Sequence, residues 1–394
     1  MRVIHVITRL IVGGAQENTI ASVLGLRLKP DVEVKLISGP ASGPEGSLER
    51  ILAAEPSLWM RIPELVRPIH PWKDVRALQR LTTIFRSSQP DIVHTHSGKA
   101  GFLGRLAAAR ARVPVIIHTI HGPSFGTFAG PLANTIFRSA EKLAGRLTTH
   151  FVVVADVMTK QYLGAGIGRP EQYTKVLSGF DVEPFLAAKP DPNLRLQLRL
   201  EPGDIVIGKI ARLFKLKGHD DLFAIAPDLI RNCPQLKFLL VGNGPWRGRF
   251  ERQARSLGLQ RHFVFTGLVS PDAVPGLIGA MDFVVHLSYR EGLARALPQA
   301  LAAGKPVIAY DCDGAAEVCL ENETGFLIKP GDLVALNGRL VQLARDPELR
   351  NRLGRRGQEL VRERFGIGHM IEDLYELYLN IAKDAGLSLN INAR

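Results

Sequence analysis

Two cations and one carboxylate in the second half of the chain have the types and spacing needed to hold a phosphorylated sugar. Arg212 and Lys217 follow a predicted strand at 205–210, and Glu291 follows another at 282–288. Arg212 offers a planar fork of donors and Lys217 a point charge, and both suit a diphosphate. Taken alone, the two cations would be interpreted as a solvated loop. Glu291 is a poor choice for phosphate by itself, but a carboxylate accepts hydrogen bonds from sugar hydroxyls.

The segment around Glu291 predicts a strand, a loop, a helix and a second strand. The apolar run 282–288 ends at Tyr289, an Ala- and Leu-rich helix is expected over 293–304, and the next strand covers 306–310. Such a unit builds a parallel sheet, whose ligands bind beyond the carboxyl ends of the strands. We therefore expect Glu291 at the mouth of a cleft. The amides after Gly292 should open the helix and favour an anion.

The same alternation of strands and helices extends over most of the 394 residues. A shift to proline and charge at 186–204 marks a boundary between two halves. Strands are expected at 2–7, 33–38, 91–95, 115–118, 150–155 and 173–177, and then at 205–210, 237–241, 263–266, 282–288, 306–310 and 325–328. The fold class is therefore α/β, with two doubly wound, Rossmann-like domains facing each other. We assign 1–186 to the first domain, 187–366 to the second, and 367–394 to a C-terminal helix.

The first half contributes a glycine turn and several histidines at predicted strand ends. Gly13 and Gly14 would let a ligand approach the backbone closely, although a tight structural turn is an equal interpretation. The turn lacks the G-x-G-x-x-G pattern of a dehydrogenase. His121 follows the strand at 115–118, and this position favours a functional role over that of a core histidine. His94 and His96 are interpreted as structural, because no partner for a metal site is evident.

The charge balance points to an anionic partner. The net charge is +12, and the segment 92–140 contains no acidic residue but includes Lys99 and Arg105. A solvated basic face is one interpretation, and attraction to an anionic lipid or a phosphorylated acceptor is the one we favour. The helix expected at 132–147 could lie on a membrane surface or be an ordinary surface helix. Nucleic-acid binding rests on charge alone, because no recognition module or aromatic platform is present.

Cysteine content and hydropathy bear on the compartment. The three cysteines, at 233, 312 and 319, form no disulfide framework and no zinc pattern, which indicates a reducing environment. No apolar run reaches the length of about 18 residues typical of a membrane-spanning helix. We expect a cytoplasmic protein, with peripheral attachment at the inner face of the membrane as an option.

In the order of these residues the chain resembles glycosyltransferase family 4, the retaining enzymes of the GT-B fold. The motifs that carry the resemblance are Gly13-Gly14, His121, Arg212 with Lys217, and the Glu291 helix. The resemblance covers nearly the whole chain and implies a GT-B fold in which the C-terminal helix crosses back to the first domain. It is weaker at 30–90 and in the tail.

The resemblance also implies a role for each residue. Gly13 and Gly14 would lie over the donor diphosphate, and His121 would assist the reacting centre near the transferred sugar. Arg212 and Lys217 would stabilise the departing nucleoside diphosphate, and Glu291 would bind sugar hydroxyls. The remaining donor-site residues would be Gly242, Leu268, Gly292, Leu293, Ala294 and Gln299, with Lys99 on the acceptor side.

Two positions depart from the family pattern. The family has a second glutamate where this chain has Gln299, which keeps an acceptor oxygen for the ribose but loses charge-assisted strength. Ala294 stands where the family usually has proline, and Pro298 lies inside the expected helix. Because Pro298 has no N–H, we expect the helix to start late or to kink.

Together these observations predict a glycosyltransferase that moves a sugar from a nucleoside diphosphate to a hydroxyl acceptor with retention. A UDP-sugar is favoured over GDP-mannose, and a lipid-linked or polysaccharide acceptor is expected. We interpret no acidic motif or His/carboxylate cluster as a metal site, and Arg212 and Lys217 can supply the charge, so we expect no cofactor. Two alternatives stay open: a nucleotide-sugar epimerase of the same architecture, and an inactive nucleotide-sugar-binding protein.

Overall fold

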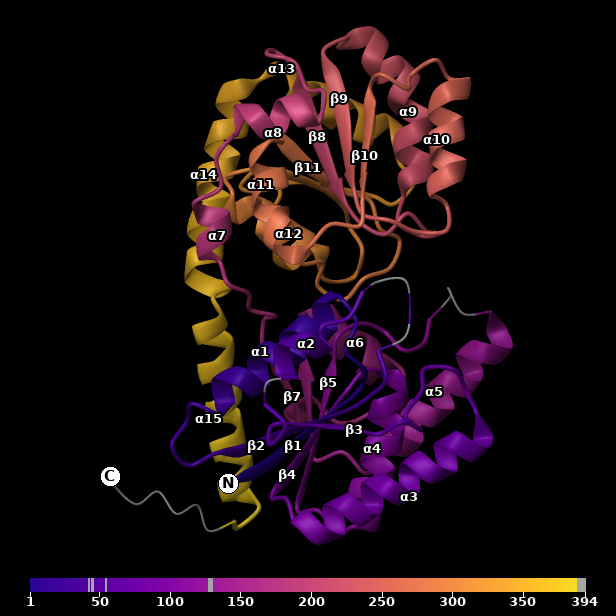
Figure 1. The fold of residues 1–394 in the computed structure, drawn as a ribbon, viewed down its shortest axis with the longest axis vertical. Helices are drawn as coiled ribbons and strands as arrows, with labels where there is room; N and C mark the ends of the chain where they lie inside the picture. The colour runs from indigo at the N-terminus through magenta and orange to yellow at the C-terminus, as the bar shows by residue number, and fades with distance from the viewer. Residues whose placement is uncertain (42, 44–45, 54, 127–129, 388–394) are drawn as a thin grey trace. The chain divides into compact units, whose positions relative to one another are not determined.

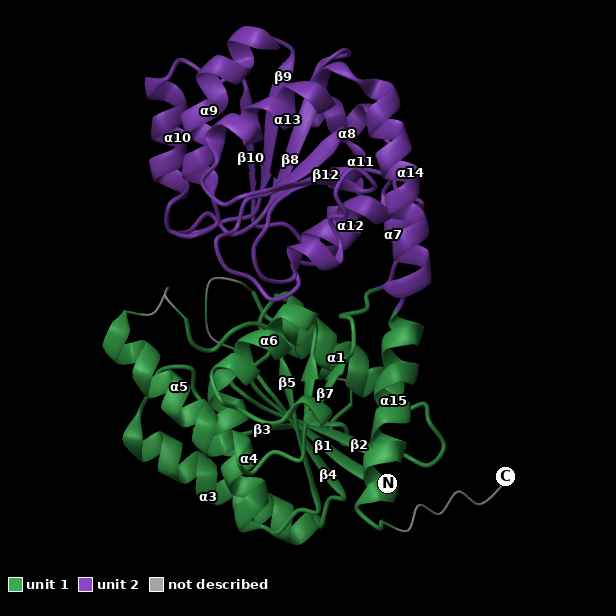
Figure 2. Cartoon of the chain, turned by 180° about the vertical axis from the view of Figure 1, so that it is seen from behind, with its two compact units in different colours: residues 1–180, 367–394 green, residues 181–366 purple. Residues whose placement is uncertain are grey.

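The computed structural model describes residues 1–41, 43, 46–53, 55–126 and 130–387. The chain divides into two compact units, unit 1 (Met1–Phe180 with Ile367–Arg394) and unit 2 (Asp181–Gly366). Figure 1 traces the elements of each unit, and Figure 2 colours the two units separately. The division falls after Phe180 and not after residue 186. The short helix α7 (Glu183–Leu186) packs against α11 (Val274–Gly279) and α12 (Ala296–Ala302) of unit 2, which explains the earlier boundary.

Unit 1 contains a seven-stranded parallel sheet in the order β3-β2-β1-β4-β5-β6-β7. Every pairing between neighbouring strands is parallel, as predicted for a doubly wound domain. The strands are β1 (Arg2–Arg9), β2 (Glu33–Gly39), β3 (Trp59–Arg61), β4 (Ile92–His96), β5 (Val115–Ile120), β6 (His150–Val153) and β7 (Tyr173–Lys175). The helices are α1 (Gly14–Leu26), α2 (Glu49–Leu52), α3 (Pro71–Ser88), α4 (Gly98–Arg110), α5 (Pro131–Gly145), α6 (Asp156–Gly164) and α15 (Ile367–Asp384).

Alternation along β1 builds a core on each face of this sheet. Val3 and Ile7 join the core that α1 and α15 cover, whereas Ile4 and Val6 join the core under α3 and α4. Figure 1 shows α15, in yellow, beside the indigo α1, although the two helices lie at opposite ends of the sequence. The predicted return of the C-terminal helix to the first domain is therefore confirmed.

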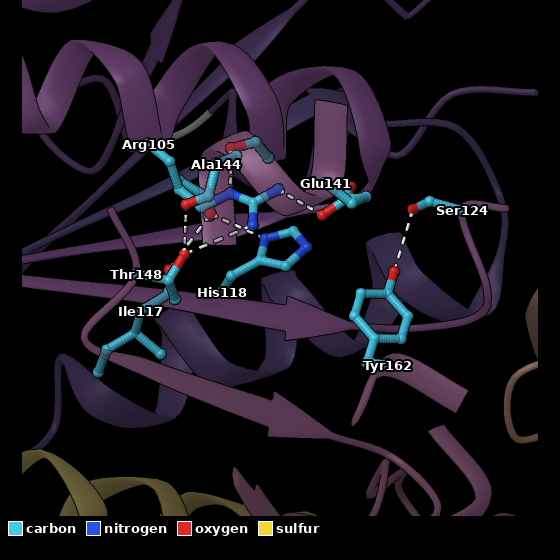
Figure 3. A network of polar contacts seen from close by, with 10 residues as sticks. Arg105, Ile117, His118, Ser124, Glu141, Ala144, Thr148 and Tyr162 are labelled. Carbon is cyan, nitrogen blue, oxygen red and sulfur yellow. Dashed lines mark hydrogen bonds and ion pairs between the residues drawn. The ribbon is translucent and has the colours of Figure 1, made fainter. Parts of the chain in front are cut away.

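A buried ion pair fastens α5 to α4 in unit 1. Arg105 Nη2 lies 2.8 Å from Glu141 Oε2, and both side chains are almost fully buried. Figure 3 shows the guanidinium of Arg105 between Glu141 and Thr148. Arg105 Nε also donates to the carbonyl oxygen of Gly101 at 2.8 Å. The segment 92–140, which contains no acidic residue, is therefore not a continuous solvated face. Arg105 lies in the interior, and its counter-charge, Glu141, lies just beyond the segment.

Unit 2 contains a six-stranded parallel sheet in the order β10-β9-β8-β11-β12-β13. A stack of aromatic rings from Phe223, Phe238, Phe250 and Phe263 fills part of its core. The strands are β8 (Ile205–Ile210), β9 (Leu236–Val241), β10 (Phe263–Gly267), β11 (Phe283–His286), β12 (Val307–Tyr310) and β13 (Gly325–Ile328). The remaining helices are α8 (Pro192–Gln197), α9 (His219–Asn232), α10 (Arg247–Ser256), α11 (Val274–Gly279), α12 (Ala296–Ala302), α13 (Leu333–Arg345) and α14 (Pro347–Arg364).

The two parallel-sheet units confirm the predicted α/β fold class. No helix among the described residues combines the length and the hydrophobicity needed to cross a membrane.

Candidate active site

The predicted cation and carboxylate of unit 2 meet in the structure. Lys217, in the loop between β8 and α9, forms an ion pair with Glu291 Oε1, in the loop between β11 and α12. The two side chains are 22% and 26% exposed, so each reaches solvent while most of its surface is covered. The ends of two adjacent parallel strands therefore bring together groups that the sequence separates widely.

Several further groups fix Glu291. Ser288 Oγ donates to Glu291 Oε1 at 3.1 Å, and the Glu291 N–H donates to Asp313 Oδ2 at 2.7 Å. His286 Nε2 lies 3.5 Å from the same carboxylate oxygen. Burial opposes ionisation of Glu291, but His286 and the charge of Lys217 outweigh it and hold the pKa of this carboxyl well below its usual range. Glu291 is therefore a fixed anion that can accept hydrogen bonds from hydroxyls.

Lys209 adds a buried amine beneath this pair, near the carboxyl end of β8. Its side chain is 1% exposed, and its Nζ has no hydrogen-bond partner among the described residues. Burial, and to a smaller extent the charge of Lys217, lowers the pKa of Lys209 to about 7, although Asp221 and Glu291 act in the opposite direction. Lys209 is thus poised to gain a proton when additional negative charge arrives.

Arg212 lies in the same loop as Lys217, and its side chain is exposed. Its guanidinium carbon lies 5.5 Å from the centre of the Phe214 ring, within the range of a cation–π contact. The loop therefore presents both predicted cations, Lys217 partly buried on Glu291 and Arg212 at the surface.

Gly242 holds the ends of three strands of unit 2 close together. It follows β9 with φ of +133°, and its N–H donates to the carbonyl oxygen of Gly267 at 3.1 Å. A side chain at this position would overlap the carbonyl oxygen of Ala211, at the start of the Arg212 loop. Leu268 follows Gly267 and is 53% exposed, which leaves an apolar surface beside these loops.

The helix after Glu291 is shorter than the sequence predicts. It spans Ala296–Ala302 instead of 293–304, and Pro298 falls in its first turn, where no N–H is required. The expected late start is confirmed. Gly292, Leu293 and Ala294 lie in the loop before the helix and do not open it, and phosphate binding by their amides stays a prediction. Gln299 lies within the first turn and is partly exposed.

The glycine turn of unit 1 leads directly into α1. Gly13 is the residue before the helix, and Gly14 is its first residue. Gly13 has φ of 169°, an extended conformation that any residue can adopt, so the backbone does not require glycine there. A side chain at Gly13 would crowd the side-chain oxygen of Gln16.

His121 and Lys99 both lie near the ends of unit-1 strands, and both have partners. His121 Nε2 lies 3.1 Å from His96 Nδ1, which makes His121 the outermost member of a group of histidines. Lys99 forms an ion pair with Asp74 and donates to the carbonyl oxygen of Pro68, so its charge is partly neutralised.

The structure places beside His94 and His96 a third histidine that the sequence did not reveal as their partner. His5, from β1, lies beside them, and one ring nitrogen from each of the three lies within 4.8 Å of the others. His5 and Lys209 were missed because each lies inside an apolar strand, where the pattern indicates only burial. The signal available in the sequence was the two-residue alternation of a strand, which places each of these side chains on a face of the sheet that it shares with other polar residues.

Comparison with known proteins identifies the family. Residues 18–176 match the model of the glycosyl transferase 4-like domain, and residues 191–360 match glycosyl transferases group 1. EpsD of Bacillus subtilis, which is named as a glycosyltransferase, is 30% identical over 80% of this chain and 83% of that protein. The chain belongs to glycosyltransferase family 4. The predicted enzyme class, a glycosyltransferase, is therefore confirmed.

Other relatives carry more specific names. An Escherichia coli α-1,3-galactosyltransferase, named for transfer from UDP-Gal to α-D-GlcNAc-diphosphoundecaprenol, is 26% identical over 81% of this chain and 83% of that protein. Among solved structures, HepE of Anabaena in complex with UDP-glucose has a TM-score of 0.79 at 23% identity, and the match covers 96% of this chain and 100% of that one. This second likeness supports the GT-B fold of the family 4 glycosyltransferase.

Proposed function

We propose that this glycosyltransferase moves a sugar from a nucleoside diphosphate sugar to a hydroxyl acceptor with retention at the anomeric carbon. The donor is a UDP-sugar in preference to GDP-mannose. The Escherichia coli relative is named for UDP-Gal, and HepE was solved with UDP-glucose. The mycobacterial relatives are named for GDP-mannose, which is the second candidate donor. These relatives are named as transferases, so they do not support the alternative of an epimerase.

The observation that carries this proposal is the ion pair between Lys217 and Glu291. The departing diphosphate develops negative charge, and a preorganised cation stabilises that charge most effectively in a partly buried site. Glu291, fixed by Ser288 and by its own N–H bond to Asp313, would accept hydrogen bonds from hydroxyls of the transferred sugar. Glu291 would thus bind the sugar on one side of the glycosyl–phosphate bond that breaks, and Lys217 would bind the diphosphate on the other side.

Two further cations would supply the remaining positive charge that the diphosphate needs, in place of a metal ion. Arg212 would bind the diphosphate from the exposed end of the loop, and Lys209 would add charge from below by taking up a proton. With these groups in place we expect transfer to be independent of divalent cations. Gly242 and Leu268 would form the nucleotide side of the site, and Gln299 would bond the ribose. We also propose a catalytic role for His121 of unit 1.

The proposed acceptor is a lipid-linked saccharide at the inner membrane face. The Escherichia coli relative is named for such an acceptor, and the mycobacterial relatives for phosphatidylinositol monomannoside. In unit 1, α3 begins with exposed apolar side chains, Trp72 at 77% and Val75, beside Lys73 and Arg76. Apolar side chains flanked by cations favour an anionic bilayer surface.

Incubation with radiolabelled UDP-sugars, GDP-mannose and a panel of polyprenyl diphosphate-linked saccharides tests the proposal. We expect label transfer from one UDP-sugar, undiminished by EDTA, and a product whose fresh NMR spectrum retains the donor's anomeric configuration. Inverted product would exclude retention, and transfer from GDP-mannose alone would reverse the donor assignment. Absence of binding to anionic liposomes at low salt would remove the membrane part.

The role of Gln299 needs a separate comparison. Gln299→Glu should tighten donor binding modestly, because a carboxylate gives a charge-assisted bond to the ribose. If the wild type shows no turnover and only the Gln299→Glu variant is active, the result would instead favour an inactive nucleotide-sugar-binding protein.

A further inference from the structure

Three buried histidines share one face of the unit-1 sheet. His5 lies on β1, and His94 and His96 lie on β4, all at most 1% exposed. The parallel register sets His5 beside His94, and the two-residue alternation turns all three side chains to the face covered by α15. The same alternation along β5 brings Thr119 to this face.

Hydrogen bonds join these rings into one continuous run, which we call the histidine chain. It contains four histidines, one tyrosine and one threonine. His121 Nε2 lies 3.1 Å from His96 Nδ1, and His96 Nε2 lies 2.9 Å from His5 Nδ1. His5 Nε2 lies 3.2 Å from the hydroxyl of Tyr378, on α15. The same hydroxyl lies 2.5 Å from His94 Nδ1, and His94 Nε2 lies 2.6 Å from Thr119 Oγ1.

The buried rings are neutral. Burial lowers the pKa of His5 to about 3, and burial together with the neighbouring histidines lowers the pKa values of His94 and His96 well below their usual range. A neutral imidazole has one N–H donor and one acceptor nitrogen. Each ring can therefore donate on one side only, so the direction of donation is the same at each step from ring to ring.

Two arrangements make every bond in the chain and also pair the proton of the Tyr378 hydroxyl within it. When the Tyr378 hydroxyl donates to His5 Nε2, the proton sits on Nδ1 of His5, and the same follows for His96 and His94. When the hydroxyl donates to His94 Nδ1, the proton sits on Nε2 of His94, His5 and His96. In the first case His121 Nε2 accepts from His96, and in the second it donates. A mixed arrangement would set two donors or two acceptors against each other, or would leave the buried Tyr378 hydroxyl proton without an acceptor in the chain.

We propose that the hydroxyl of Tyr378 determines which nitrogen of His121 carries its proton, acting through His5 and His96. Tyr378 is then a positioning residue that ties the C-terminal helix to a residue assigned to the reaction. The consequence for transfer rests on the proposed function, because it requires that His121 contact the sugar. The proton position decides whether Nδ1 of His121 donates a hydrogen bond or accepts one.

A metal ion held by His5, His94 and His96 is the competing interpretation. One nitrogen from each residue lies within 4.8 Å of the others. However, the histidine chain uses both ring nitrogens of all three residues as hydrogen-bond partners. A metal ion would have to break these bonds to bind.

Long-range ¹H–¹⁵N correlation spectra of the full chain with ¹⁵N-labelled histidine test the proposal at neutral pH. Single histidine-to-glutamine variants assign the signals. We expect His5, His94, His96 and His121 to carry their protons on the same ring nitrogen. Different tautomers among the four rings would overturn the proposal, as would displacement of the His5, His94 and His96 signals by stoichiometric Zn²⁺.

Tyr378→Phe removes the hydroxyl and keeps the ring. We expect it to shift the ¹⁵N signals of His121, which lies three hydrogen bonds from Tyr378 along the histidine chain, by several parts per million. The matched control is Tyr375→Phe, on the same helix, whose hydroxyl bonds Asp31 Oδ1 at 2.7 Å. The control should leave His121 unchanged, and an unchanged His121 signal in Tyr378→Phe would overturn the coupling.

If the Tyr378→Phe protein does not fold, a second pair of variants tests the proposal. Thr119→Val removes the hydroxyl at the far end of the chain, and Thr119→Ser restores it. We expect the valine variant to shift the His5 signals and the serine variant to return them to the wild-type positions. Identical His5 signals in Thr119→Val and the wild type would contradict the proposal.

Kinetics separates this inference from the proposed function. Tyr378→Phe should lower kcat at least threefold while the donor KM stays within twofold. Coupled tautomers in a protein that transfers no sugar would leave the inference standing and defeat the proposed function. Sugar transfer by a protein with mixed tautomers would overturn the inference and leave the proposed function standing.

Discussion

The ammonium group of Lys217 contacts the carboxylate of Glu291 across 74 positions of sequence. Each residue follows a different strand, β8 and β11, and these strands are neighbours in the unit-2 sheet. The contact gives the site a cation for the diphosphate and, beside it, an acceptor for sugar hydroxyls.

Glu291→Gln should separate sugar recognition from diphosphate binding. We expect kcat/KM to fall by about 100-fold, the scale of one or two charge-assisted hydrogen bonds, because the neutral amide accepts more weakly. UDP, which has no transferred sugar, should bind at least as tightly as to the wild type, since Lys217 is released from its partner. Calorimetry with UDP and steady-state kinetics measure the two effects. Loss of UDP binding in this variant would contradict the assignment.

Lys209→Met should stabilise unit 2 and change its pH dependence. The pKa of Lys209 is about 7 in the fold against an ordinary 10.5, so the unfolded chain binds more protons between these values. Stability should therefore rise with pH from about 7 to 10 in the wild type, and it should be lower and flat below pH 7. The variant should lose that rise and gain about 1–4 kcal/mol at pH 6.

Urea unfolding at pH 6 to 10 measures this effect. The control is Lys35→Met, at an exposed position on β2 of unit 1. It should leave the unit-2 transition unchanged. A Lys209→Met protein with the wild-type pH profile would show that Lys209 is charged in the fold.

Glu141→Gln should destabilise unit 1 strongly. Arg105 is fully buried, and removal of its counter-charge leaves an uncompensated cation, which costs about 3–5 kcal/mol. The comparison variant is Glu372→Gln, which breaks the surface pair with Lys29 and should cost less than about 1 kcal/mol. Chemical unfolding followed by a unit-1 probe, such as Trp59 fluorescence, compares them. Equal losses in the two variants would contradict the role of burial.

Gly242→Ala should disturb the loops of the donor site. The position has φ of +133°, and a side chain there would overlap the Ala211 carbonyl at the start of the Arg212 loop. We expect UDP affinity to fall at least tenfold, which corresponds to about 1.4 kcal/mol. Gly248→Ala, in helix α10 with no atom near the added methyl group, should leave UDP binding unchanged. Wild-type affinity in Gly242→Ala would show that the loops tolerate the displacement.

The strands of both sheets were predictable from sequence because buried parallel strands appear as short apolar runs between helices. The exception is β3, since Trp59–Arg61 is only three residues long and partly exposed. The late start of α12 was predictable only from Pro298, because residues 293–295 have helical composition. The boundary at Phe180 was missed because the packing of α7 on α11 and α12 is a long-range property.

The candidate site was predicted in part for the same reason. Lys217 and Glu291 stand in polar loops directly after strands, so their position indicated a shared edge of the sheet. Lys209 and His5 lie within apolar strands, and only the register with neighbouring strands reveals their polar surroundings. Tyr378 could not be predicted as a partner of His5, because nothing local to α15 indicates which strand residues it covers.

The most direct test of the central claim compares the affinities of uridine and UDP for the wild type and for Lys217→Met. If Lys217 grips the diphosphate, the wild type should bind UDP at least about 100-fold more tightly than uridine, since charge-assisted bonds supply about 1.5–3 kcal/mol each. Lys217→Met should reduce that ratio about tenfold or more, and Lys215→Met, at an exposed lysine of the same loop, should preserve it. Equal affinities for uridine and UDP in the wild type, or an unchanged ratio in Lys217→Met, would contradict the account.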